Sequence, residues 1–206
     1  MPDEIIPPVL SYEDIRQKAD EFLRRYHAEC TIPVPIEEII EFQFGINIIP
    51  LPDLHKLFEI DGFTSSDLED ITVDQYVSET RPGRYRFTLA HEIGHVFLHE
   101  DIFRKRDFQN VGEWKDFINS IPDDSHRWLE YQAYSFGGLI LVPREPLMTF
   151  TKETVELIRK ERIDLDNNWD FAWQVIAEYL AKRFVVSTEV VEKRLTYDKV
   201  PEKFRK

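Results

Sequence analysis

The chain has 206 residues, of which 42% are hydrophobic and 13% aromatic, a composition that is typical of a globular protein and excludes a disordered chain. The formal net charge of −13 lies wholly in residues 1–80, because residues 81–206 hold equal numbers of acidic and basic side chains. This acidity disfavours sequence-independent binding of nucleic acid, which depends on attraction to phosphate. The acidic part is either a solvated face that aids solubility or a surface that attracts a basic protein partner.

The expected location follows from the cysteine count and the apolar segments. Cys30 is the single cysteine, which excludes an internal disulfide and fits a reducing compartment. The first four residues are acidic in character, whereas secretory and mitochondrial targeting segments are basic. The longest strongly apolar stretch, 136–142, is too short to span a bilayer. We expect a cytoplasmic protein that does not enter a membrane, and the oligomeric state stays open.

The first segments of the chain have helical patterns. Apolar residues recur at helical spacing over 11–30, and Ser11 is a suitable N-cap. Two prolines then interrupt the pattern. Residues 36–42 predict a short helix that ends before Gly45.

Three segments have the alternating or β-branched pattern of strands, namely 46–51, 56–64 and 71–77. We expect the first of these to be stopped by Pro50 and Pro52. From Thr88 onward the pattern is mostly helical. The order of these elements predicts an α+β fold in one domain over 1–206, with a small sheet first and helices afterwards.

A metal-binding pattern follows the predicted sheet. His91, Glu92 and His95 form an H-E-x-x-H motif. Residues four apart on a helix lie on the same side, so both imidazoles can meet one zinc ion, with Glu92 placed to take a proton from a water molecule. The apolar residues of the same segment fall on the opposite face, so one side of the helix can enter the core. Thr88 is the expected N-cap of this helix.

A catalytic zinc site has three protein ligands, so a third must come from elsewhere. His99 lies about 12 Å along the helix axis from His91, at ~1.5 Å per residue, and is therefore expected to be structural or to contact a ligand. A second helix ending at Pro143 carries Glu130, with His126 and Asp124 as competing candidates.

This second predicted helix has an apolar stripe formed by Leu129, Ala133, Phe136 and Ile140. The pair Gly137-Gly138 inside it weakens a helix, which indicates close approach to a neighbouring helix.

Two segments carry a resemblance to a known family. Residues 86–99 read R-F-T-L-A-H-E-I-G-H-V-F-L-H, and residues 130–143 read E-Y-Q-A-Y-S-F-G-G-L-I-L-V-P. They resemble the ImmA/IrrE metallopeptidase family, whose members show R-F-T-L-A-H-E-L-G-H-x-x-L-H and then E-x-E-A-N-x-F-A-A-x-L-L-M-P. The resemblance implies a zincin-like fold, with an acidic α/β part over 1–80, catalytic helices over 81–145 and a C-terminal helical part over 146–206.

The resemblance also implies the site and the substrate class. Glu130 takes the position of the third zinc ligand beside His91 and His95, and Glu92 takes that of the general base. Several family members cleave helix-turn-helix repressors, so a regulator protein is the implied substrate. Gln132 and Tyr134 depart from the family pattern, and the stretch between His95 and Glu130 is long for the family, which implies a local insertion. The oxyanion-stabilising group is unassigned, with Tyr134, His126 and Arg86 as candidates.

Residues 175–195 predict two short helices that meet near Ser187, in the manner of a helix-turn-helix. A DNA-binding role would use basic residues of this element, namely Lys182, Arg183, Lys193 and Arg194. Acidic residues in its second helix favour packing or partner recognition instead.

Three functional hypotheses follow. The first is a zinc endopeptidase that requires Glu92, and this is the one that the motif favours. The second is a non-catalytic, zinc-stabilised module that binds a repressor, and the third is a DNA-binding regulator whose binding depends on salt.

Overall fold

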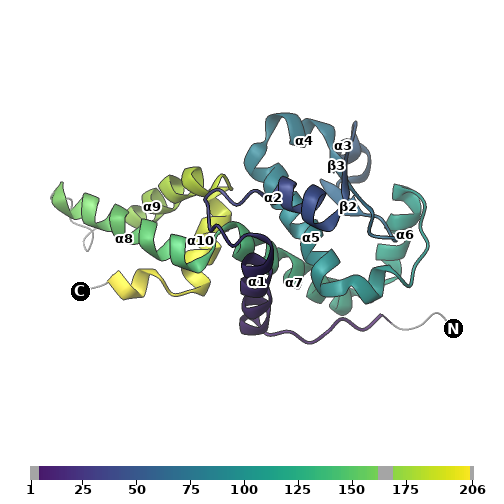
Figure 1. Cartoon of the computed structure of the whole chain (residues 1–206), viewed down its shortest axis with the longest axis horizontal. Helices are drawn as coiled ribbons and strands as arrows, with labels where there is room; N and C mark the ends of the chain where they lie inside the picture. The colour runs from purple at the N-terminus through teal and green to yellow at the C-terminus, as the bar shows by residue number, and fades with distance from the viewer. Residues whose placement is uncertain (1–4, 162–168, 205–206) are drawn as a thin grey trace.

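The computed structural model describes residues 5–161 and 169–204. Figure 1 shows the sheet near one end of the molecule and helices α8 to α10 near the other, with α5 and α7 between them. The strands are β1 (Asn47–Leu51), β2 (Gly62–Thr64) and β3 (Asp70–Asp74). The helices are α1 (Tyr12–Tyr26), α2 (Ile36–Glu38), the π-helix η1 (Ile39–Phe44), α3 (Leu54–Phe58), α4 (Gln75–Thr80), α5 (Pro82–Phe103), α6 (Val111–Ser120), α7 (Asp123–Leu141), α8 (Arg144–Lys160), α9 (Trp169–Phe184), α10 (Thr188–Tyr197) and the 3-10 helix η2 (Pro201–Phe204). The predicted α+β fold is confirmed.

The first helix begins where the sequence predicts. The Ser11 hydroxyl accepts a hydrogen bond from the Asp14 backbone N–H at 3.2 Å, and the Asp14 carboxylate accepts one from the Ser11 N–H at 2.8 Å. This capping box satisfies two N–H groups that the first helical turn leaves unpaired. The helix ends at Tyr26 and not near Cys30, whose φ of 52° is left-handed. The second predicted helix forms as α2 and η1 and ends at Gly45, where φ is 67°.

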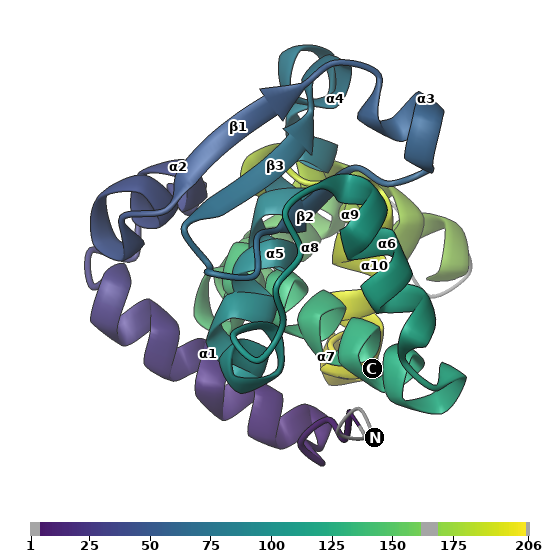
Figure 2. The ribbon, with the colours of Figure 1, turned by 90° about the vertical axis from the view of Figure 1, so that its right-hand side faces the viewer.

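The three strands form a mixed sheet in the order β1-β3-β2, with β1 parallel and β2 antiparallel to β3. Figure 2 shows the sheet spread beside α5. Pro50 was expected to stop the first strand, but it lies within β1 and is paired with Val73. An edge strand tolerates proline, because its outer side has no ladder hydrogen bond to lose.

Two strand predictions were wrong in extent, and Asp74 explains both. Residues 56–64 were expected to be one strand, but α3 occupies 54–58 and β2 is limited to 62–64. Residues 71–77 were expected to be another, but β3 stops at Asp74 and α4 follows. One carboxylate oxygen of Asp74 accepts from the Val77 N–H at the start of α4, and the other accepts from the His55 N–H in α3, both at 2.9 Å. A single buried carboxylate therefore caps two helices.

The long helix α5 begins earlier than predicted. It starts at Pro82, which suits the first helical turn because that position needs no N–H donor. Thr88, the expected N-cap, lies inside the helix and donates to the Arg84 carbonyl at 3.1 Å. The predicted apolar face is confirmed, since Leu89 and Ile93 are fully buried and Val96 is nearly so.

Helices α5 and α7 pack closely because glycines face backbone at their crossing. A Cβ added to Gly137 would lie 3.2 Å from the backbone of Ala90 and His91, and one added to Gly94 would lie 3.1 Å from the Ala133 carbonyl oxygen. The close approach predicted from the glycine pair is therefore confirmed at Gly137. The apolar stripe of α7 is confirmed as well, because all four of its residues are buried.

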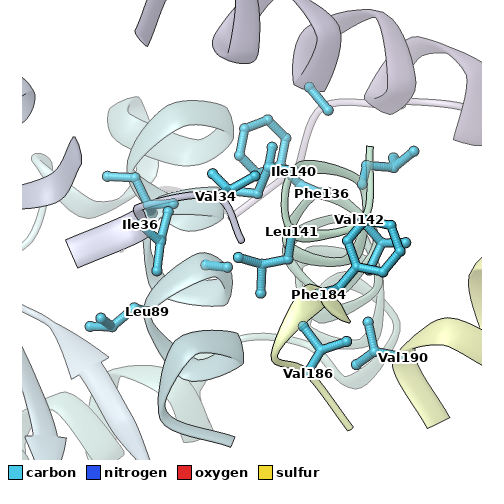
Figure 3. Close-up of a cluster of buried hydrophobic side chains, with 14 of the residues drawn as sticks. Val34, Ile36, Leu89, Phe136, Ile140, Leu141, Val142, Phe184, Val186 and Val190 are labelled. Carbon is cyan, nitrogen blue, oxygen red and sulfur yellow. The ribbon is translucent and has the colours of Figure 1, made fainter. Parts of the chain in front are cut away.

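The buried core is continuous from the sheet side to the C-terminal helices. Figure 3 shows Leu89 of α5, Phe136 and Ile140 of α7, and Phe184 and Val190 near the junction of α9 and α10 within one cluster. Along residues 5–161 and 169–204, no helix combines the length and the apolar character that crossing a bilayer requires.

Candidate metal centre

One group of side chains in the described residues has the composition and spacing of a metal site. The ligand atoms of His91, His95 and Glu130 all lie within 4.8 Å of one another. The two Nε2 atoms are 3.1 Å apart, and the Glu130 oxygens lie 3.3 Å from His91 Nε2 and 3.4 Å from His95 Nε2. Ligand atoms at ~2.0–2.1 Å from a tetrahedral zinc ion lie about 3.3 Å from each other. The donor set and its spacing therefore fit a zinc ion.

The backbone explains how these three side chains meet. His91 and His95 are one turn apart on α5, and Glu130 comes from α7. The close crossing at Gly94 and Gly137 brings α7 near enough for its carboxylate to reach both imidazoles.

A chain of hydrogen bonds fixes the tautomer of His95. The Gln132 amide nitrogen donates to the Pro8 carbonyl at 2.7 Å, so the Gln132 amide oxygen faces His99 Nε2 at 3.1 Å and accepts from it. His99 Nδ1 is then the acceptor of the 3.1 Å contact with His95 Nδ1. His95 consequently keeps a proton on Nδ1, so that Nε2 would direct its lone pair toward a cation held between His91 and Glu130.

His99 therefore does not join the cluster, as its distance along the helix predicts, but contacts a candidate ligand. His99 and Gln132 are both buried, and burial together with the charge of His95 lowers the pKa of His99 to about 3. A neutral His99 suits this chain, because it must accept at one nitrogen and donate at the other.

The electrostatics of the cluster favour opposite charges on its members when no cation is bound. Burial disfavours charge on Glu130, but hydrogen bonds from His91 and His95 outweigh it and hold the Glu130 pKa below its ordinary value. Burial likewise opposes protonation of His91, but the hydrogen bond and charge of Glu130 raise the His91 pKa. A bound cation would take the place of the proton that these groups share.

Glu92 lies on the same helix and is buried. Its Oε2 accepts a hydrogen bond from the hydroxyl of Thr64 at 2.9 Å. Thr64 is the last residue of β2, so a strand end holds this carboxylate in place. Thr64 was not predicted to belong to the site, because nothing in a segment 28 residues away indicates which helix it will contact.

The competing ligands are placed outside the group. His126 Nε2 is 3.7 Å from a Glu130 oxygen, at the border of the cluster, and the Asp124 side chain is fully exposed beside Arg127.

Arg86 donates to the carbonyls of Val34 and Val185, and so joins α5 to neighbouring loops. The long stretch between His95 and Glu130 holds α6, whose Trp114 packs on Phe63 of β2.

The predicted pair of C-terminal helices forms, with the Ser187 hydroxyl accepting from the Val190 N–H at 3.4 Å. Three of the four basic residues considered for DNA contact have partners within the protein. Arg183 pairs with Glu153, Lys193 pairs with Glu189, and Arg194 is buried against Asp198. These contacts favour a packing role for the element.

Comparison with known proteins decides the family. The family model described as the IrrE N-terminal-like domain (Peptidase_M78) matches residues 43–196. The chain belongs to this family. The match confirms the resemblance inferred from residues 86–99 and 130–143, and with it the zincin-like α+β fold. Membership and the His-His-Glu group together indicate a metallopeptidase-type protein.

A solved structure named Mycobacterium tuberculosis transcriptional regulator is similar to this family member at a TM-score of 0.50 and 15% sequence identity, a likeness of fold alone. The match covers 89% of this chain and 46% of that one, so this chain spans about half the length of the solved structure. No curated protein matches the sequence.

Proposed function

We propose that this protein is a zinc-dependent endopeptidase that cleaves a transcriptional regulator, with a helix-turn-helix repressor as the preferred class of substrate. The observation that carries the proposal is the meeting of two imidazole Nε2 atoms and one carboxylate at 3.1–3.4 Å, with Glu92 on the same helix. Family membership supports the peptidase class.

The roles of the residues follow from their placement. His91, His95 and Glu130 would hold the zinc ion. Zinc in such a site acts as a Lewis acid that acidifies a water molecule and polarises a carbonyl group. Glu92 accepts the proton of the attacking water and later delivers it to the leaving amine, while Thr64 keeps the carboxylate oriented.

The substrate class is the one that the family resemblance implies, and the charge of the chain supports it. The acidic excess of residues 1–80 attracts basic proteins, and DNA-binding domains present basic surfaces. Together with the single cysteine, such a substrate fits a cytoplasmic location.

The first experiment measures metal content and cleavage with matched variants. We expect about one zinc per chain in wild type and in Glu92→Gln, and loss of zinc in Glu130→Ala. Wild type and Glu92→Gln, both loaded with zinc, are then incubated with a lysate in which new peptide N-termini are labelled and sequenced. New termini in a regulator that depend on Glu92 support the proposal.

Three other outcomes contradict it. Zinc that Glu130→Ala leaves unaffected would place the third ligand elsewhere, and absence of zinc under all loading conditions would overturn the hydrolase. Binding of a regulator that persists in Glu92→Gln, without any cleavage by wild type, would identify a non-catalytic binding module instead.

A further inference from the structure

A cavity of about 430 Å³ adjoins the candidate metal centre. Its wall includes His91 and Glu130 of the centre, Tyr134 and Gly138 of α7, and Tyr197 of α10. Cavities of ~300–1,000 Å³ bind small molecules and single side chains. A polypeptide held at the centre would therefore have room for one of its side chains here.

Gly138 is one of the residues that line the cavity. A Cβ added at this position would meet, among the described residues, the Arg194 Cδ at 3.6 Å, which is an ordinary contact. Its neighbour Gly137 is enclosed by the backbone of α5 instead. The two glycines therefore serve different purposes, because Gly137 permits helix packing and Gly138 leaves space in the cavity wall.

Aromatic rings form much of the wall. Tyr12 of α1 and Tyr197 of α10 stack with their ring centroids 4.9 Å apart. The Tyr134 ring is held by Phe87 at 4.7 Å, and its hydroxyl accepts from Lys193 Nζ at 3.0 Å. Tyr134 is also one of the departures from the family pattern. Rings that are fixed in this way can stack with an aromatic guest.

The cations of the wall are neutralised by acidic neighbours. Lys193 lies 2.8 Å from Glu189, Arg194 lies 2.8 Å from Asp198, and Arg127 lies 3.6 Å from Asp124. The first two pairs hold Lys193 and Arg194 close to carboxylates, so an acidic guest at these cations would have to compete with carboxylates already in place. The wall is therefore better suited to an uncharged guest.

We propose that this cavity binds an aromatic side chain of the protein substrate, next to the bond that is cleaved. The proposal rests on the proposed function, because it takes the adjacent centre as the place where the peptide is held. It assigns Tyr134, Tyr197 and Gly138 to substrate selection.

Hydroxamic acids test the cavity without knowledge of the natural substrate, since the hydroxamate group binds zinc and its substituent probes the neighbouring space. Acetohydroxamic acid, 3-phenylpropionohydroxamic acid and the monohydroxamate of succinic acid are titrated into the zinc-loaded full chain by calorimetry. We expect the phenyl compound to bind at least about ten times more tightly than acetohydroxamic acid, and the succinyl compound to show no such gain.

Two variants report on the cavity itself. Gly138→Leu fills it and should abolish the advantage of the phenyl compound. Tyr197→Ala, at a half-exposed position, should reduce the advantage by about three- to ten-fold. The matched control is Tyr179→Ala, because Tyr179 is similarly exposed on α9 but does not line the cavity.

Each remaining outcome overturns the proposal. The outcomes also show whether the aromatic cavity alone is wrong or the proposed function fails as well. If acetohydroxamic acid binds but the phenyl group adds nothing, or if its advantage persists in both cavity variants, the aromatic cavity is wrong and the zinc site stands. A gain for the succinyl compound instead would identify an acidic guest. If no hydroxamate binds the zinc-loaded chain, the proposed function fails and this inference fails with it.

Discussion

The amide nitrogen of Gln132 donates a hydrogen bond to the carbonyl oxygen of Pro8 at 2.7 Å, although 124 residues separate them in the sequence. The same carbonyl accepts from the Trp128 indole at 3.1 Å. The amide oxygen of Gln132 accepts a hydrogen bond from His99 Nε2, and His99 Nδ1 in turn accepts from His95 Nδ1, which fixes the tautomer of His95. The segment before α1 is thereby linked to the candidate metal centre.

The first prediction tests the amide oxygen and the amide nitrogen of Gln132 separately. Gln132→Leu removes both hydrogen bonds and should weaken zinc binding by about 10–100-fold, because His95 loses the chain that orients it. Gln132→Glu keeps an acceptor for His99 and loses the donor to Pro8. It should retain most of the zinc affinity and show faster amide exchange at Val9 and Leu10. Competition with a chromophoric chelator measures the affinity, and equal losses in both variants would contradict the proposed chain.

The second prediction compares adjacent glycines. Gly138→Ala should raise the free energy of unfolding by about 0.5–1 kcal/mol, since alanine favours the helix and its Cβ has room. Gly137→Ala should lower it by about 1–3 kcal/mol, because its Cβ would press on the backbone of Ala90 and His91. Urea unfolding of the two variants measures the difference. Stabilisation by both substitutions would show that α5 and α7 can move apart without lowering the free energy of unfolding.

The third prediction concerns buried charge. Asp198 has a side chain only 1% exposed and pairs with both Arg16 and Arg194. Asp198→Ala leaves two buried guanidinium groups without their carboxylate and should cost about 3–5 kcal/mol of unfolding free energy. Glu100→Ala is the control, because Glu100 pairs with Arg104 at the same spacing of four residues but at the surface. Its cost should stay below about 1 kcal/mol, and similar costs for both variants would refute the role of burial.

The fourth prediction concerns the double cap at Asp74 and its dependence on pH. Asp74→Asn offers one acceptor for two backbone N–H groups and should lower the free energy of unfolding by about 1–2 kcal/mol at neutral pH. Burial opposes the charge of Asp74, but backbone hydrogen bonds led by that of His55 lower its pKa below the ordinary value. The carboxylate therefore contributes stability above its unfolded pKa of about 3.8, and the contribution disappears as pH falls through the lower folded value.

The difference between wild type and Asp74→Asn should accordingly shrink as unfolding is measured at successively lower pH below about 4. Asp53→Asn is the matched control, because Asp53 precedes α3 without a side-chain cap hydrogen bond. Its effect should stay within about 0.5 kcal/mol at every pH. A difference for Asp74→Asn that is constant with pH would show that the charge of the carboxylate is unimportant.

Local patterns predicted the parts of this protein that depend on neighbours in sequence. The spacing of His91 and His95 and the cap at Ser11 are properties of a single helix, and the structure shows both helices. The glycine pair indicated a close helix crossing for the same reason, because an exception to helix propensity is visible in sequence alone. The family match then confirmed the family and the fold that the two motifs implied.

The features that could not be predicted from the sequence depend on contacts between distant segments. The spacing of residues left Glu130, His126 and Asp124 as alternatives, and the crossing of α5 and α7 determines which of them meets the histidines. The strand expected over 56–64 was replaced by α3, whose start is stabilised by Asp74 from another segment. The contacts of Thr64 with Glu92 and of Gln132 with Pro8 likewise join segments that no periodic pattern relates.

The position of Pro50 within β1 bears on how copies of this protein behave at high concentration. A free sheet edge presents unpaired N–H and C=O groups on which another chain can extend the sheet, and such pairing leads to aggregation. Pro50 removes one donor from the short edge strand and so interrupts the row of groups that an incoming strand would need. Pro50, which was expected to end β1, is thus compatible with the strand and makes the outer edge of β1 a poor template for self-association.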